Sequence, residues 1–142
     1  MNIWDYYSSG YHIVIPTNEC VKSNGEAVMG AGLALQAKIR FQNLAKSYGL
    51  SLKSGQSLMV HEGYRVICVP TKGDWRDKST VARITAACYG LAKTLETHPE
   101  MRLAIPALGC GLGGLNWEKT IKPLMTGVFS RFGERVALLP PQ

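Results

Sequence analysis

The sequence predicts an α/β sandwich with a mostly parallel sheet, built as one domain over residues 1–142. Three observations lead to this prediction. Short β-branched runs alternate along the chain with segments whose apolar residues recur at helical spacing. A chain of 142 residues is long enough to bury one core, and it contains no repeat or linker. Its content of 46% hydrophobic and 18% charged residues excludes a disordered protein.

The first half of the chain contributes three strands and one helix to this prediction. The run YHIVIPT, residues 11–17, is β-branched and is stopped by a proline. A helix is expected from Ala31 to about residue 48, because apolar residues recur there at helical spacing, namely Leu33, Ala37, Phe41, Leu44 and Tyr48. QSLMVHE and YRVICVP are two further strands, joined by a turn at Glu62–Gly63.

The second half continues the alternation. Ser79 is a candidate N-cap for a helix whose apolar stripe consists of Ile84, Cys88, Leu91 and Leu95. RLAIPAL, residues 102–108, is a strand, and another helix begins near Asn116. Pro123 is expected in a first turn of that helix, since a proline in the interior would break it. RVALLPPQ forms the last strand, which two prolines end.

Charge and cysteine content restrict the class of protein. The net charge of +6 suits a phosphate-bearing partner such as a nucleic acid, although the basic residues are scattered. The sequence has neither an apolar run of roughly 18 residues nor a signal peptide, so we expect a cytoplasmic protein with no membrane partner. Its four cysteines form no CxxC pair, so we expect no metal site and no cofactor. Cys68 and Cys88 fit core positions in a reducing compartment.

The stretch NGEAVMGAGLALQAK places Gly30 and Gly32 just where a helix must begin. A glycine inside an element costs about 0.5–1 kcal/mol relative to alanine, so a purely structural role is a weak explanation. Glycines at such a point allow the backbone to approach an anion that lies on the helix N-terminus. This pattern predicts an anion-binding segment.

A second glycine cluster, LGCGLGGLNW, also follows a strand and precedes a helix. Gly109, Gly111 and Gly114 satisfy the dinucleotide pattern G-x-G-x-x-G, but that fingerprint belongs to a first βαβ unit, and only 28 residues follow Gly114 here. Alone, the cluster could equally be a structural turn. Because strand-to-helix loops converge beyond the carboxyl ends of a parallel sheet, the two glycine segments together predict a diphosphate site.

Three stretches, GEAVMGAGLALQ, VPTKGDWR and IPALGCGLGGLNW, resemble the macrodomain family in their order and spacing. The resemblance extends from NIWDYY to VALLPP. The chain looks most like the branch that contains the antitoxin macrodomains of DarT/DarG systems, which remove ADP-ribose from thymidine in DNA. The terminal ADP-ribose hydrolases that free carboxylate side chains belong to the same branch.

This resemblance implies a macrodomain-like three-layer sandwich, a mixed sheet with helices on both faces that lacks the first edge strand. In this family two glycine loops wrap the diphosphate of ADP-ribose, which makes ADP-ribose or an ADP-ribosylated substrate the expected partner. The resemblance implies that both loops bind through backbone N–H groups. The matching residues are Gly30, Ala31, Gly32 and Leu33 in the first loop, and Gly109, Cys110, Gly111, Leu112 and Gly113 in the second.

Three asparagines are candidates for contacts with the ends of the ligand. Asn18 matches a family asparagine near the distal ribose, and Asn24 could take that role because the following loop is longer here. Either could instead be a turn or cap residue. In many macrodomains an aspartate just before the W-D-Y stretch accepts a hydrogen bond from adenine N6. Asn2 stands at that position, and its amide oxygen can still accept.

Lys72 is the candidate catalytic residue, since PTK ends a strand at the position of the catalytic lysine of this branch. Its amine could attack the ring-opened distal ribose and form a Schiff base. Such an attack requires a neutral amine, and a nearby cation, Arg76 or Lys38, could favour that form. The alternative is a solvated lysine at a strand end with no functional role. Trp75 and Arg76 could wall the site or meet the substrate, and one hydrolase subgroup has an aspartate partner where Gly113 stands.

Other chemistry is less well supported by the sequence. Cys110 lies in a loop at a helix start, where thiolates are favoured, but no histidine is related to it in the sequence. Asp74 and Asp77 flank the lysine and could form an acid/base pair or be solvated loop charges.

Three functions stay open at this point. The chain could be an ADP-ribosyl hydrolase that releases ADP-ribose from a modified macromolecule such as DNA, and Lys72 favours this reading. It could be a non-catalytic ADP-ribose-binding module, or an ADP-ribose 1″-phosphate phosphatase. The sequence leaves open whether the substrate is DNA, RNA, protein or a small molecule, and it leaves the oligomeric state open.

Overall fold

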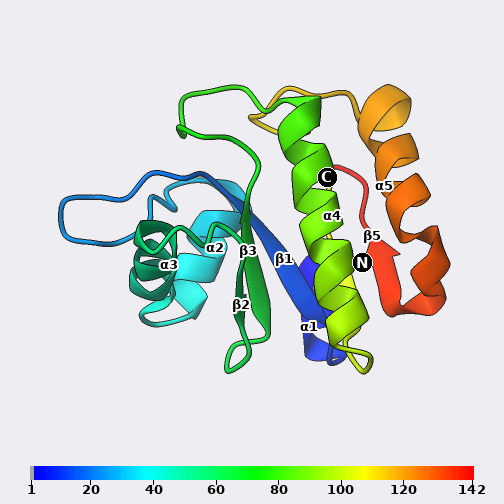
Figure 1. The fold of residues 1–142 in the computed structure, drawn as a ribbon, viewed down its shortest axis with the longest axis horizontal. Coiled ribbons are helices and arrows are strands. Elements are labelled where there is room, and N and C mark those ends of the chain that lie inside the picture. The colour runs from blue at the N-terminus through cyan, green and yellow to red at the C-terminus, as the bar shows by residue number, and fades with distance from the viewer. Residues whose placement is uncertain (1) are drawn as a thin grey trace.

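The computed structural model describes residues 2–142, which form a mixed sheet in the strand order β2-β3-β1-β4-β5 (Figure 1). The central strand β1 (His12–Thr17) pairs in parallel with β3 (Val66–Pro70) and β4 (Leu103–Ile105). β5 (Val136–Leu138) continues the parallel part, and β2 (Met59–His61) is the one antiparallel strand among the described residues. The predicted α/β class with a mostly parallel sheet is confirmed.

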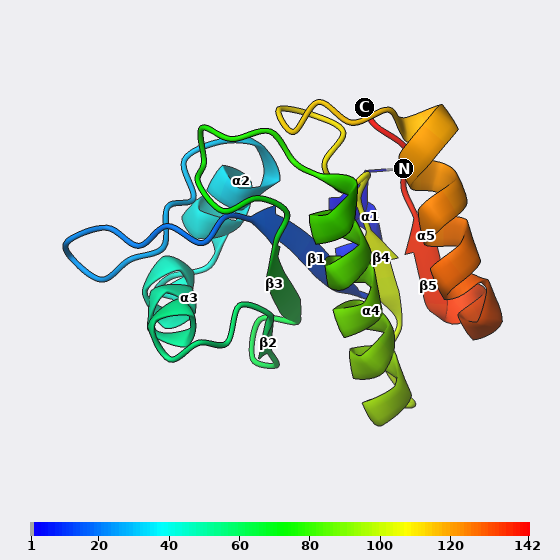
Figure 2. The same cartoon turned by 45° about the horizontal axis from the view of Figure 1, so that its top comes forward.

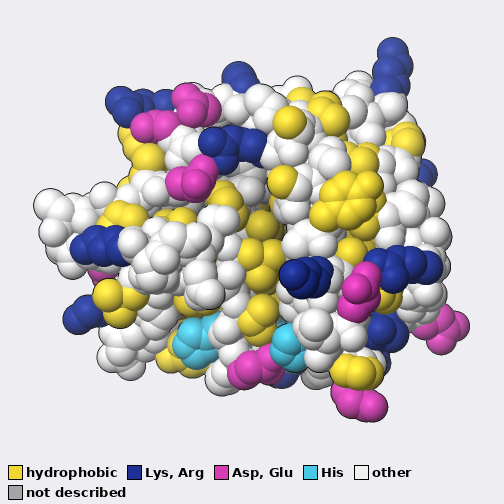
Figure 3. Space-filling model, in the orientation of Figure 1, with side chains coloured by type: hydrophobic (Ala, Val, Ile, Leu, Met, Phe, Trp, Pro, Cys, Tyr) yellow, Lys and Arg dark blue, Asp and Glu magenta, His cyan; other side chains and the backbone are white. Residues whose placement is uncertain are grey.

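Helices cover both faces of this sheet, as the resemblance implied. α4 (Val81–Thr97) and α5 (Lys122–Phe129) pack on one face and lie in front of the sheet in Figure 1. Lys and Arg side chains are scattered over the surface on this side of the molecule (Figure 3). α1 (Ile3–Ser8), α2 (Gly32–Arg40) and α3 (Leu44–Lys53) pack on the other. Alternate residues of β1 serve the two cores, since Val14 packs with α4 while Ile13 and Ile15 face the opposite side.

The single helix expected from residue 31 to about 48 is wrong, because two helices occupy this range. Phe41 has extended backbone angles (φ −117°, ψ 101°), and Asn43 is left-handed (φ 66°). The break places the Phe41 ring 4.9 Å from the Tyr64 ring and beside two aromatic rings of α1. These contacts with residues distant in the sequence hold the chain in the break. The apolar spacing in the sequence does not reveal the break, because α2 and α3 pack into the same core.

Helix α4 begins one residue later than expected. Thr80 is the N-cap, and its side chain accepts a hydrogen bond from the N–H of Arg83 at 3.2 Å, so the assignment of the cap to Ser79 is wrong. Thr and Ser are both good caps, and their order alone does not distinguish them. The predicted apolar stripe is fully buried, which confirms Ile84, Cys88, Leu91 and Leu95 as core residues.

The start of α5 agrees with the prediction. Asn116 accepts a hydrogen bond from the N–H of Lys119 at 2.8 Å and caps a π-helical turn, Trp117–Ile121. Pro123 then occupies the first turn of α5, where a missing N–H has no consequence.

The N-terminal helix α1 was not predicted, because its six residues are too few to show a period. Asn2 and Asp5 form a capping box at its start. Within residues 2–142 no strand precedes β1, and β5 is an edge of the sheet. None of the helices in this range combines the length and the apolar content required to cross a membrane.

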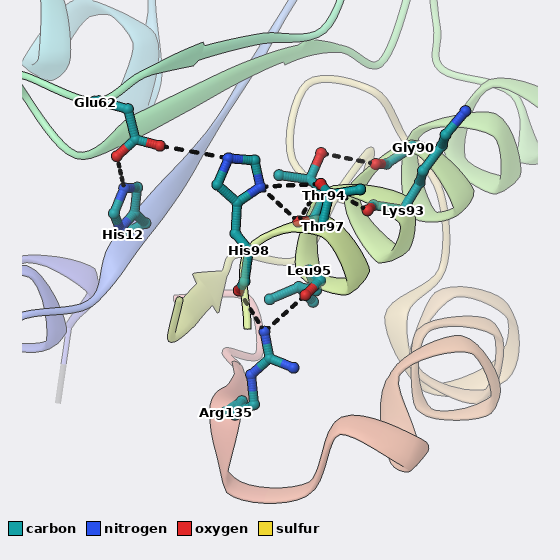
Figure 4. Close-up of polar contacts among 9 residues, drawn as sticks. All are labelled: His12, Glu62, Gly90, Lys93, Thr94, Leu95, Thr97, His98 and Arg135. Atoms are coloured by element: carbon teal, nitrogen blue, oxygen red, sulfur yellow. Dashed lines mark hydrogen bonds and ion pairs between the residues drawn. The ribbon is translucent and has the colours of Figure 1, made fainter. Parts of the chain in front are cut away.

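Polar contacts tie the sheet to α4 at the end where β1 begins (Figure 4). Glu62 lies between two histidines, with its carboxylate 3.2 Å from His12 Nε2 and 3.7 Å from His98 Nε2. Arg135 closes the C-terminal end of α4: its guanidinium donates to the carbonyls of Leu95 and His98, both at 2.8 Å.

We expect Arg135→Ala to lower the free energy of unfolding by about 2 kcal/mol, because carbonyls at a helix end lose charge-assisted hydrogen bonds. Urea denaturation followed by circular dichroism measures this. Arg131→Ala is the matched control, since the guanidinium of Arg131, like that of Arg135, lies over the Phe132 ring but forms an exposed ion pair with Glu96 in place of hydrogen bonds to the end of α4. Its loss should cost no more than about 1 kcal/mol. Equal losses for the two variants would contradict a capping role for Arg135.

Candidate functional site

Three strand-to-helix loops meet at the carboxyl ends of β1, β3 and β4, where Figure 2 shows them side by side. They enclose a cavity of about 560 Å³, a size typical of sites for small molecules. Its wall comes from the end of β1 and from both glycine segments, together with the loop after β3. The lining residues are 16–18, 28–34, Thr71, Lys72, Trp75, Ser79, Ala107, Gly109, Gly111, Leu112 and Gly113.

The first glycine segment, residues 30–33, ends at the N-terminus of α2. Ala31 is the N-cap and offers no side-chain hydrogen bond, so the first N–H groups of the helix have no capping side chain. A Cβ built on Gly30 or Gly32 would meet nothing within 4 Å, which leaves the backbone open to a ligand. Gly32 also has a φ of +55°, a left-handed conformation that favours glycine.

The second glycine segment, residues 109–113, is a closed loop. The N–H of Leu115 donates to the carbonyl of Gly109 at 2.9 Å. No hydrogen bond among residues 2–142 uses the N–H groups of Gly111, Leu112 or Gly113. The two segments therefore present unpaired backbone donors to one cavity, as expected for an anion site.

Gly113 has a steric reason to be glycine. A Cβ at this position would lie 2.6 Å from the Gly109 carbonyl oxygen and would overlap Ser79 Oγ. The loop in this conformation therefore has no room for an aspartate partner of Lys72.

Cys110 does not line the cavity, unlike its neighbours in the segment. Its N–H already donates to the carbonyl of Ala107 at 3.3 Å, and its Sγ lies 3.5 Å from the carbonyl of Leu108. Burial raises the pKa of the thiol, which disfavours the thiolate. These contacts argue against a ligand-binding or nucleophilic Cys110.

The structure brings only one of the three predicted asparagines to the cavity. Asn18 lines it, and its amide is held by the carbonyl of Val28 (3.1 Å) and the N–H of Cys20 (2.9 Å). Asn24 lies in a loop closed by the Val21–Ala27 bridge, where it bonds only Glu26. Asn2 caps α1, accepting from the N–H groups of residues 4 and 5, and is outside the cavity wall.

Lys72 follows β3 directly and lines the cavity. None of the ion pairs among residues 2–142 involves it, so its amine is not held by a carboxylate. Trp75 and Leu112 also line the cavity. They are 54% and 71% exposed, so both form its rim.

Arg76, a predicted ligand-binding residue, and Lys38, the other cation proposed to act on Lys72, do not line the cavity. Arg76 instead makes two hydrogen bonds of 2.8 Å to the Asp74 carboxylate. These hydrogen bonds hold the pKa of Asp74 well below its usual range. Asp77 accepts from the N–H of Asp74, so both aspartates shape the loop and neither fits an acid/base pair in the cavity.

Ser79 is a cavity residue that the sequence did not point to. It lines the wall behind the second segment, and its N–H donates to the carbonyl of Gly113 at 3.1 Å. A serine next to a helix start usually indicates an N-cap, and the sequence analysis assigned Ser79 that role. Its position in the cavity wall was therefore not predicted.

Known proteins resemble this chain in sequence and in structure. No family model matches it. The chain is 30% identical, over 95% of its length, to a Mycobacterium tuberculosis protein named DNA ADP-ribosyl glycohydrolase, and it spans 41% of that relative. It is also 28% identical to the solved macrodomain of Mycobacterium tuberculosis DarG, with a TM-score of 0.79, over 92% of this chain and 88% of that one.

The chain has the macrodomain fold. A second solved structure similar to this macrodomain is Thermosipho africanus DarTG in complex with ADP-ribose. The TM-score is 0.80 and the identity 25%, over 95% of this macrodomain and 39% of that chain. The predicted resemblance to DarG-type macrodomains is confirmed. The chain spans about two fifths of the length of the Mycobacterium relatives that it matches.

Proposed function

We propose that residues 1–142 form a single macrodomain that binds ADP-ribose in the cavity and hydrolyses the bond joining ADP-ribose to modified DNA. The observation that carries the proposal is the pair of glycine segments, whose unpaired N–H groups face one cavity with Lys72 in its wall. The names of the relatives, DNA ADP-ribosyl glycohydrolase, support the reaction and the substrate. The free thiols of all four cysteines suit the reducing cytoplasm, where we propose it acts.

Binding requires no charged side chain in this arrangement. The N–H groups of residues 111–113 hold one phosphate, and the N-terminus of α2 holds the other, where the helix dipole also favours an anion. Glycine allows the backbone to come close to both phosphates. Asn18 then lies beside the distal ribose, at the end of β1.

Lys72 supplies the nucleophile in this proposal. Its amine attacks C1″ of the distal ribose, and the bond from C1″ to the DNA base breaks. As the ring opens to a Schiff base, one amine proton goes to the departing base and the other to the ring oxygen. Water then hydrolyses the Schiff base, which frees ADP-ribose and restores the amine.

The proposal is tested by offering two modified substrates side by side, a single-stranded oligonucleotide ADP-ribosylated on thymidine and a protein ADP-ribosylated on glutamate. We expect release of free ADP-ribose from the oligonucleotide. The KM for the oligonucleotide should rise with salt, because phosphate contacts of a basic protein release counterions, while the Kd for free ADP-ribose should change little.

Two results would contradict the proposal at different points. Release from the protein but not from the oligonucleotide would reject DNA as the substrate. Absence of a thermal shift with millimolar ADP-ribose would reject the binding site itself, since a ligand at 100 times its Kd stabilises by about 2.7 kcal/mol.

A further inference from the structure

The hydroxyl of Ser79 is an unpaired polar group in the wall of the cavity. Only 5% of the residue is exposed. Among residues 2–142, its Oγ is the single buried side-chain nitrogen or oxygen without a hydrogen-bond partner. Folded proteins leave few such atoms unpaired, because a buried donor without a partner destabilises the fold. The exception therefore requires a reason.

A capping role does not provide that reason. Thr80, the next residue, is the N-cap of α4 and accepts the hydrogen bond from Arg83 that a serine could have taken. Ser79 hydrogen-bonds to the local structure through its backbone, whose N–H donates to the carbonyl of Gly113. Its hydroxyl is left free beside the loop.

The second glycine segment is built around this hydroxyl. Gly109 and Gly113 lie against Ser79, and at either position a Cβ would crowd the serine side chain. The adjoining N–H groups of Gly111, Leu112 and Gly113 are also unpaired. Several donors without partners thus gather on one side of the cavity, a pattern typical of a site that a ligand completes.

We infer that Ser79 Oγ donates a hydrogen bond to an oxygen of the ligand bound at the second glycine segment, either a phosphate or a ribose oxygen. The identity of the ligand as ADP-ribose rests on the proposed function. An oxygen held by the N–H groups of residues 111–113 lies against the same loop as the serine. A change of χ1 between staggered positions turns the hydroxyl from the loop to that oxygen.

Ser79→Ala tests this inference, because stability and affinity should change in opposite directions. The free protein should keep or raise its melting temperature, since the variant loses an unpaired buried hydroxyl. The Kd for ADP-ribose, measured by calorimetry, should rise about tenfold, the value of one hydrogen bond. A Kd equal to wild type, or a lower melting temperature in the free variant, would overturn the inference.

Thr80→Ala is the matched control at the neighbouring position. Thr80 does not line the cavity, and its loss removes the cap of α4. This variant should melt at a lower temperature while its Kd for ADP-ribose stays within about twofold. If Thr80→Ala weakened binding as much as Ser79→Ala, the effect at Ser79 would be a general loosening of the loop and the inference would fail.

The same titration with ADP identifies the oxygen. If Ser79→Ala weakens ADP and ADP-ribose equally, the partner is a phosphate; if it weakens ADP-ribose alone, the partner is the distal ribose. These titrations measure binding of free ADP-ribose and do not depend on turnover. A wild-type protein that binds ADP-ribose but does not cleave it from modified DNA would therefore overturn the proposed reaction alone. A wild type that binds no ADP-ribose would overturn both.

Discussion

Lys72→Ala is expected to slow the release of ADP-ribose from modified DNA by about 100-fold or more, because a nucleophile acts in the transition state. Affinity for free ADP-ribose should stay within about tenfold of wild type, a change of 1.4 kcal/mol. Lys72 lines the cavity without a carboxylate partner, so its removal leaves no buried charge unpaired. Single-turnover release and calorimetry measure the two quantities separately.

Lys72→Arg separates a nucleophile from a cation. The guanidinium keeps the charge but stays protonated and cannot form a Schiff base. We expect this variant to be as slow as Lys72→Ala. Borohydride added during turnover should reduce the Schiff base and attach ADP-ribose to the peptide that contains Lys72. Activity in Lys72→Arg would show that the lysine acts only by its charge, and turnover without a trapped adduct would argue against the covalent route.

Gly111→Glu is expected to abolish binding of ADP-ribose while the protein stays folded. A Cβ at Gly111 meets nothing within 4 Å, and the residue has no positive φ, so the protein tolerates the side chain. The new carboxylate would lie where backbone N–H groups face the ligand, and it would repel a phosphate. We expect the Kd to rise by about 100-fold or more, corresponding to at least 2.7 kcal/mol. Calorimetry measures the Kd, and circular dichroism checks the fold.

The first segment is better tested at Gly30 than at Gly32. Both have open space for a Cβ, but Gly32 is left-handed, so a substitution there would also strain the backbone. Gly127→Glu is the matched control, since this exposed glycine of α5 also has nothing within 4 Å and lies outside the cavity. If Gly30→Glu or Gly111→Glu bound as well as Gly127→Glu, the corresponding segment would be a structural turn.

The sequence predicted the order of the strands along the chain and the principal parts of the cavity, because both depend on local signals. The prolines after β5 and the buried stripe of α4 are visible in the residues themselves. The prediction that a proline stops the first strand is wrong, because Pro16 lies within β1 and pairs with Val69 of β3. The split between α2 and α3 was not predictable in this way. It depends on the contact of Phe41 with the ring of Tyr64, a residue far along the chain.

The candidate site shows the same division. The glycine segments and Lys72 could be placed from their order along the chain, since the carboxyl ends of parallel strands share one edge of the sheet. The contacts that each side chain makes could not be predicted in this way. Arg76 was predicted to contact the ligand and instead pairs with Asp74 outside the cavity wall. Ser79 was predicted to be a cap and lies in the cavity wall. Which of two neighbouring polar residues faces the cavity is decided by the folded loop.

The donors of this site belong largely to the main chain, and this affects how the site would look in a mutational scan. Truncation to alanine removes side-chain atoms, whereas the N–H groups of Leu112 or of the glycines would remain in place. Alanine substitutions at the non-glycine residues of the site should therefore find few sensitive positions, chiefly Lys72 and Ser79. Larger residues at Gly30 and Gly111, where a Cβ has open space, should give the strong losses of binding. The surface that faces the ligand is formed largely by glycines, so residues without side chains define the site.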